Sequence, residues 1–185
     1  MAKSATSATA VAPARVLAPH AIIEQNLARA ESAALACSEI SKIFNVGLTE
    51  VALMRVEGDA LNFLFPAELK AAGSIPLSST KAVAARTANT RKVELFNNFV
   101  IVQHANVFET IKLTTLGQSN APGASTIQKL ISAPIIDSRH RALGVLQVCH
   151  KGLTPEESGS DFTLNDLYNI EVVARSLAKL SFMRG

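Results

Sequence analysis

The chain has 185 residues, of which 48% are hydrophobic, 18% are charged and 5% are aromatic. This length corresponds to one domain with short extensions, and the apolar share excludes a wholly disordered chain. No apolar run reaches the roughly 18–20 residues of a membrane-spanning helix, so we expect no membrane partner. Two cysteines, Cys37 and Cys149, are too few for a disulfide framework or a structural zinc site.

The net charge of +3 is concentrated near the N-terminus. No Asp or Glu precedes Glu24, whereas Lys3 and Arg15 fall in that stretch. Residues 1–20 are rich in Ala, Ser, Thr and Pro and have no periodicity, which predicts a disordered tail, with a targeting peptide as the alternative. The remaining chain is nearly neutral, so we expect no nucleic-acid partner.

The predicted elements begin with one long helix. Apolar residues recur at spacings of three, four and six from Ala21 to Asn45, and Gly47 stands just past the end. A hairpin follows, with strands at Glu50–Val56 and Ala60–Phe65 around the turn residues 57–59.

The middle of the chain is less regular. Ser78 or Ser79 could cap a short helix at 80–88, and a short strand is predicted at 91–96. Residues 97–112 combine a loop with a helix. Residues 114–125 form a predicted loop of a length that is often functional.

The strongest strand pair spans 126–136 and 142–150, around a turn at 137–141. The near-continuous apolar composition of its second strand indicates that both faces are covered. The last helix runs from 164 to 180, with Thr163 as its N-cap. This order predicts an α+β fold, in which an antiparallel sheet has a helix pair on one face and small helices on the other.

The last strands and helix resemble the GAF domain family. The segments are LISAPIID, RALGVLQVCHK and DFTLNDLYNIEVVARSLAKL, and the matching residues are Pro134, the Gly-Val-Leu-Gln run at 144–147, Lys151, Phe162 and Asp166. Upstream, LSSTKAVAARTANTRKVELFNN is similar to the helix and strand that follow the central linker of these domains. The resemblance implies a single GAF-like domain at 21–185, with five to six strands and a ligand pocket beside the short helices.

The cyclic-nucleotide-binding branch of this family shows Asn-Lys and Asp-Glu where this chain has His150-Lys151 and Asp166-Leu167. This departure weakens the case for a cyclic nucleotide and leaves the fold assignment unchanged. The resemblance also implies a structural latch made of Lys151, Phe162 and Asp166, in which the Lys and the Asp can form an ion pair.

The family's pocket, carried over to this chain, implies eight ligand-binding residues: Ser79, Thr80, Phe96, Asn97, Asn98, His104, Thr126 and Gln128. Amides, hydroxyls and a His in an apolar pocket can form hydrogen bonds with the polar edge of a ligand's ring. The alternatives are that Asn97-Asn98 is only a turn and that the pocket is filled by the protein itself.

The sequence offers little catalytic chemistry. Cys149 and His150 are neighbours on a strand, so their side chains point to opposite faces and cannot act as a Cys–His pair. Both cysteines are expected to be small buried hydrophobes. No metal site and no required cofactor are predicted, and haem on His104 is a minor alternative.

These observations predict a non-enzymatic sensory or regulatory domain in the cytoplasm that binds a cyclic nucleotide or another small metabolite. The resemblance implies a homodimer through the helices at 21–45 and 164–180, whose bundle would be built by Ile23, Leu27, Ala30, Ala34, Ile170, Val173, Leu177 and Leu180. The alternative function is a structural dimerisation or protein-interaction module without a ligand.

Overall fold

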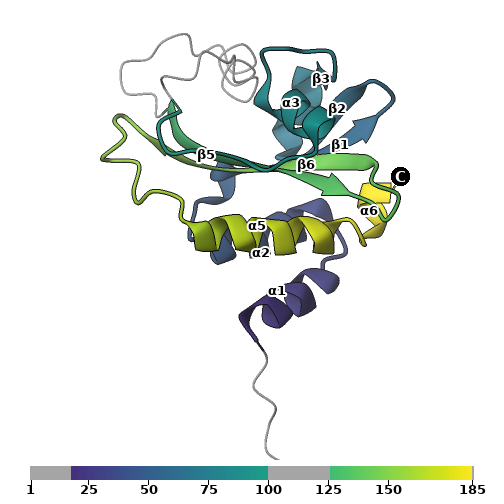
Figure 1. The fold of residues 1–185 in the computed structure, drawn as a ribbon, viewed down its shortest axis with the longest axis horizontal. Helices are drawn as coiled ribbons and strands as arrows, with labels where there is room; N and C mark the ends of the chain where they lie inside the picture. The colour runs from purple at the N-terminus through teal and green to yellow at the C-terminus, as the bar shows by residue number, and fades with distance from the viewer. Residues whose placement is uncertain (1–17, 100–125, 185) are drawn as a thin grey trace, which may run out of the picture.

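The computed structural model describes residues 18–99 and 126–184. Within them, six antiparallel strands form one sheet in the order β3-β2-β1-β6-β5-β4. Helices α2 and α5 lie on one face of the sheet and α3 lies on the other (Figure 1). The predicted α+β architecture is confirmed, while the loop predicted at 114–125 lies outside the described residues.

Both predicted hairpins are present. β1 (Val51–Glu57) pairs with β2 (Ala60–Phe65), and β5 (Thr126–Ile136) pairs with β6 (Ala142–Gly152). β6 also pairs with β1, so it lies at the centre of the sheet and both of its faces are covered, as predicted. Short strands form the two edges: β3 (Ser74–Pro76), which was not predicted, and β4 (Glu94–Phe96).

The prediction of one helix over 21–45 is wrong, because the chain breaks it into α1 (Pro19–Ala28) and α2 (Ala33–Phe44). Ser32 starts the second helix by accepting a hydrogen bond from the Leu35 amide at 3.3 Å, as an N-cap residue does. Pro19 takes the first helical turn, where its missing N–H is not needed. The segment predicted as a tail therefore ends inside a helix.

The remaining helices follow the predicted order. α3 (Val83–Thr90) begins a few residues later than expected, and α5 (Leu164–Leu177) is capped by Thr163 as expected. The last predicted helix is shorter than 164–180, since the chain turns and continues as α6 (Ser181–Arg184). Two 3-10 helices, η1 (Leu48–Glu50) and η2 (Ala67–Ala72), flank the first hairpin.

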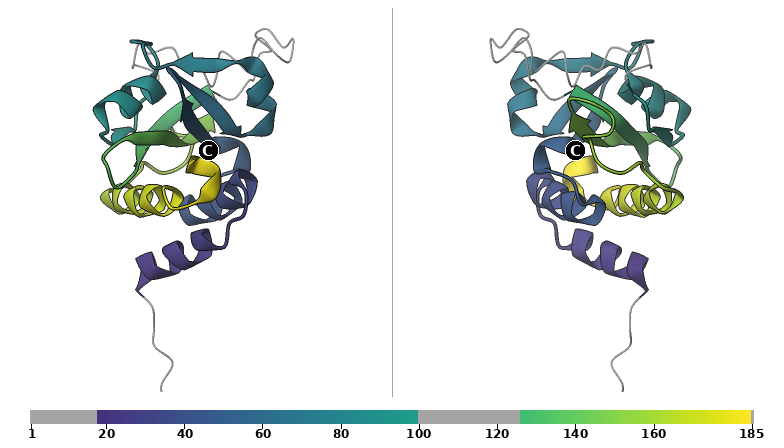
Figure 2. Two further views of the ribbon diagram at one scale, coloured as in Figure 1. Left: turned by 90° about the vertical axis from the view of Figure 1, so that its right-hand side faces the viewer. Right: turned by 90° about the vertical axis from the view of Figure 1, so that its left-hand side faces the viewer.

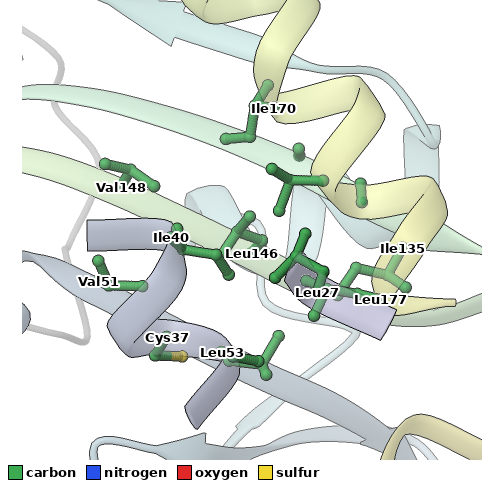
Figure 3. Close-up of a cluster of buried hydrophobic side chains, with 14 of the residues drawn as sticks. Leu27, Cys37, Ile40, Val51, Leu53, Ile135, Leu146, Val148, Ile170 and Leu177 are labelled. Atoms are coloured by element: carbon green, nitrogen blue, oxygen red, sulfur yellow. The ribbon is translucent and has the colours of Figure 1, made fainter. Parts of the chain in front are cut away.

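The sheet divides the hydrophobic core into two clusters. One lies between the sheet and the helices α1, α2 and α5, where Ile40, Leu146 and Leu177 are fully buried (Figure 3). The other lies between the sheet and α3 and includes Met54 and Leu130. α1 sits outside the α2–α5 layer (Figure 2), yet its Leu27 belongs to the first cluster.

This packing corrects the residues expected in a dimer bundle. Leu27, Ile170, Val173 and Leu177 are all 0% exposed inside the chain's own core. A buried side chain cannot also form an interface, so these four residues stabilise the single chain. No helix in the two described stretches has the length and apolar character needed to cross a membrane.

Candidate functional site

The candidate site is the face of the sheet beneath α3, where the sequence places the floor of a pocket. A chain of hydrogen-bonded polar groups is buried there. Thr87 Oγ1 lies 2.8 Å from Ser132 Oγ and 3.2 Å from Glu94 Oε1. Gln147 Nε2 donates to Ser132 Oγ at 3.2 Å. Thr87 and Ser132 are 0% exposed and Gln147 is 7% exposed.

The hydrogen-bond chemistry fixes the direction of this polar chain. A carboxylate only accepts, so the Thr87 hydroxyl donates to Glu94. The Ser132 hydroxyl must then donate to Thr87, while it accepts from the Gln147 amide. The Ser132 proton therefore points to a hydroxyl that is not a general base, so this serine is not arranged as a nucleophile.

Glu94 ends the polar chain and is held by Arg86 of α3. Arg86 Nε donates to Glu94 Oε1 at 3.1 Å, and Arg86 Nη2 bonds the other carboxylate oxygen. The same guanidinium lies 5.8 Å from the centroid of the Phe96 ring, a cation–π contact. Phe96 also packs edge-on against Phe99. The polar chain thus ties α3 to the centre of the sheet.

A β-bulge rearranges the predicted floor of the pocket. The register of β5 shifts between Ile127 and Lys129, so Ile127 joins Leu130 in the cluster beneath α3. The extra residue is Gln128, whose Nε2 donates to Thr126 Oγ1 at 2.9 Å and to the Gly152 carbonyl at 3.0 Å. These acceptors fix the orientation of the amide.

Gln128 is 2% exposed, and its Oε1 has no hydrogen-bond partner among the residues that the structure describes. It is the only buried polar side-chain atom of the described residues that has no hydrogen-bond partner. Buried polar atoms are almost always satisfied, so an exception needs an explanation.

Other predicted ligand-binding residues have different roles. Ser79 Oγ accepts from the Ala82 amide at 3.2 Å ahead of α3, and Thr80 and Asn98 are exposed. Asn97 forms two hydrogen bonds with the backbone of Phe162. Its Oδ1 accepts from the Phe162 amide at 2.8 Å, and its Nδ2 donates to the Phe162 carbonyl at 3.0 Å. The predicted His104 lies outside the described residues.

The residues of the predicted latch hold the connection between β6 and α5 through other partners. Lys151 Nζ donates to the Thr49 carbonyl at 2.6 Å, and Asp166 accepts from the Thr163 amide at 2.7 Å in a capping box. Phe162 stacks on His150, with ring centroids 4.5 Å apart. These contacts hold each of the three residues, and the ion pair between Lys151 and Asp166 stays a prediction.

The titratable groups near the sheet do not form a catalytic set among the residues that the structure describes. Burial raises the pKa of the Cys37 thiol to about 12, so this cysteine is not a thiolate near neutral pH. Cys149 is buried in the cluster beneath α3, and His150 stacks on Phe162 of the opposite cluster. In the described stretches, no group of three His, Cys, Asp or Glu side chains could hold a metal ion.

The sequence matches no family model and no curated protein. The fold matches solved GAF domains. The GAF domain of an Acinetobacter phosphoenolpyruvate-protein phosphotransferase is 12% identical with a TM-score of 0.59, over 86% of this chain and 87% of that one. The nlh2 GAF domain of A. aeolicus is 15% identical with a TM-score of 0.57, over 90% and 94%. This chain therefore has the GAF fold, as its resemblance implied.

A third match shows that the fold does not decide between sensing and catalysis. fRMsr of Staphylococcus aureus, an enzyme solved in complex with its substrate, is 16% identical with a TM-score of 0.50. The match covers 92% of this chain and 98% of that one. Function must therefore be argued from the residues of the site.

Sequence reasoning missed the buried polar chain. Its available signal is that Ser132 and Gln147 interrupt strands that are otherwise nearly all apolar. Their pairing across β5 and β6, and their link to Thr87 of α3, depend on contacts between residues 15 to 45 positions apart.

Proposed function

We propose that this chain is a sensory or regulatory domain that binds a small molecule at the β5 bulge, beside Gln128, and catalyses no reaction. The observation that carries the proposal is the unpartnered Oε1 of Gln128. A buried acceptor without a donor costs about 1–3 kcal/mol. A ligand that donates an N–H or O–H to this oxygen removes that cost and gains affinity from it.

The ligand that suits this acceptor is a polar ring with at least one donor at its edge. A cyclic nucleotide or another small metabolite, such as a purine, has this character. We also propose a cytoplasmic location, which is supported by the two buried free cysteines, since free thiols are usual in reducing compartments.

Ligand occupancy would reach the helices through β5. Ser132 belongs to the polar chain beneath α3, whereas its neighbours Ile131 and Ala133 face the cluster that contains α5. Closely packed cores transmit small displacements. A shift of β5 that accompanies ligand binding would therefore change the position of α5, and also that of α1, which packs on α5.

The test is a thermal-shift screen with cyclic nucleotides, purines and amino acids. A compound present at 100 times its dissociation constant should stabilise the fold by about 2.7 kcal/mol. The Gln128→Leu variant should bind that compound about tenfold more weakly, since it lacks the acceptor. The Gln25→Leu variant, which makes the same substitution at an exposed residue of α1, is the matched control. Absence of stabilisation by every compound would overturn the proposal.

The second candidate is a structural dimerisation or protein-interaction module without a ligand. It is favoured by the small hollow between Ala52, Leu130, Gln147 and Cys149, which leaves no room even for a water molecule. Ligand pockets usually measure about 300–1,000 Å³. Native mass spectrometry of the protein purified from its own cells separates the two functions, because a sensor should retain an additional small mass.

A further inference from the structure

Two basic segments that lie far apart in the sequence meet in the structure. Arg91 follows α3, and its Nη1 donates to the carbonyl of His140 at 3.1 Å. His140 belongs to the turn between β5 and β6, which also carries the exposed Arg139 and Arg141. These segments lie 49 positions apart in the sequence, and the Arg91–His140 hydrogen bond joins them at the turn of the β5–β6 hairpin.

An open groove begins at this junction. It has an empty volume of about 510 Å³ and runs between β5, α5 and the segment that joins α3 to β4, with Arg91 and Arg175 on its lining. The apolar part of the lining is aliphatic and comes from Val93, Pro134, Ile136 and Ala174. We call this surface, together with Lys92, Arg139 and Arg141, the basic groove.

The basic groove holds an excess of positive charge that the rest of the described surface lacks. It carries five basic side chains with two acidic ones, Asp137 and Glu171, whereas the other described residues comprise ten basic and twelve acidic ones. Asp137 is already engaged, because its carboxylate accepts from the amides of Arg139 and Arg141 and from the Arg141 guanidinium. Arg175 has no ion pair within the described residues.

We propose that the basic groove binds an extended acidic segment of a partner protein, in which apolar side chains alternate with carboxylates. The carboxylates would meet Arg91, Arg139 and Arg175, since Arg forms paired hydrogen bonds to carboxylates. The apolar side chains would cover Val93 and Ile136. Val93 of the lining directly precedes the edge strand β4, and sheet edges commonly receive extended peptides.

Other occupants fit the groove less well. The chain's own N-terminal segment has no Asp or Glu before Glu24, so it offers no carboxylate. A nucleic acid would find no aromatic side chain on the groove lining for its bases to stack on. The aliphatic lining and the arginines together favour a protein segment.

The test uses the full chain and a fluorescein-labelled decapeptide of alternating Glu and Leu. Fluorescence anisotropy in low salt should show saturable binding. The Arg91→Glu, Arg175→Glu double variant should bind about tenfold or more weakly, since attraction is replaced by repulsion at two positions. The Arg29→Glu, Lys81→Glu variant makes the same charge change at exposed residues elsewhere and should bind within about twofold of the unaltered chain.

Further probes and a milder variant complete the experiment. A decaglutamate peptide should bind more weakly than the alternating peptide, because it leaves the apolar lining uncovered. The Arg91→Gln, Arg175→Gln variant controls for a folding defect, since circular dichroism should show that it unfolds like the unaltered chain. The proposal is overturned if both charge-reversal variants lose equal affinity, if a 20-base single-stranded DNA binds more tightly than the peptide, or if the peptide does not bind. Salt-sensitive self-association of the chain would also overturn it, in favour of a second copy as the occupant.

Discussion

Gly144 shows how one residue controls the spacing of the central strands. It lies on β6 opposite Arg55 of β1, and a Cβ atom there would overlap the carbonyl oxygen of Met54 and lie 2.7 Å from Met183 Cε. Because the first obstacle is backbone, the strands would have to separate. We expect Gly144→Ala to lower the free energy of unfolding by about 3 kcal/mol or more, as measured by urea denaturation.

Gly58→Ala is the matched control for that substitution. Gly58 lies in the β1–β2 turn with φ of 62° and no atom within 4 Å of an added Cβ. Its substitution should cost only the backbone strain of a positive φ, about 1 kcal/mol. An equal loss of stability in the two variants would contradict the steric argument at Gly144.

His150 predicts a pH dependence of stability. Burial lowers its pKa below the ordinary value of 6.5; Lys129 adds to this effect and Glu50 opposes it. In the unfolded chain the imidazole takes up its proton at a higher pH than in the folded chain. The unfolded state therefore binds more protons as the pH falls below about 6.5, and the free energy of unfolding should decrease there until the folded pKa is passed.

The His150→Phe variant tests this assignment. It keeps an aromatic ring against Phe162 and removes the titrating group. Urea denaturation between about pH 7.5 and pH 5 should show a smaller decrease in stability for the variant than for the unaltered chain. Parallel curves would mean that the decrease comes from other groups.

Two residues show why the candidate site was only partly predictable. Gln128 was expected on the floor of the pocket, but the bulge at its position turns its amide nitrogen toward Thr126 and Gly152. Asn97 was expected to face a ligand and instead brackets Phe162, 65 positions along the chain. Neither a bulge nor a long-range hydrogen bond leaves a periodic pattern in the sequence.

At the scale of elements, α1 is separated from α2 by a break in the chain and still contributes to the core. The chain breaks after Ala28, yet Leu27 is 0% exposed in the cluster with α5 and the sheet. We expect Leu27→Ala to lower the free energy of unfolding by about 2–5 kcal/mol. Ile22→Ala, at a residue of the same helix that is 46% exposed, should cost about 0.5 kcal/mol or less. Similar costs for both would indicate that α1 does not dock in solution.

The helices and strands themselves were more predictable than the connections between them. The two hairpins and α5 follow from alternating apolar residues, turn residues and the Thr163 cap, because these signals are local. The break between α1 and α2 was missed, since Leu27, Ala30 and Ala34 keep a helical spacing across it. The local signal is Ser32 alone, without the acidic or amide residue three positions later that completes a capping box.

At the scale of the whole molecule, the helices can support a dimer only through side chains that the core leaves exposed. Leu164 and Tyr168 of α5 are 84% and 50% exposed and lie one turn apart. The Tyr168 ring meets His20 of α1 edge-on at 6.5 Å, so the exposed apolar surface spans both helices. A homodimer, if it forms as proposed, should bury this surface.

Light scattering tests this arrangement. We expect the unaltered chain to have twice its mass of 19.6 kDa, and the Leu164→Glu, Tyr168→Glu variant to return to 19.6 kDa, because a buried unpaired carboxylate strongly opposes association. Leu153→Glu changes a residue that is 60% exposed in the connection before α5, and it should remain dimeric. A mass of 19.6 kDa for the unaltered chain at high concentration would refute the dimer. Dissociation by Leu153→Glu alone would place the interface away from α1 and α5, and signalling through those helices would then require another partner.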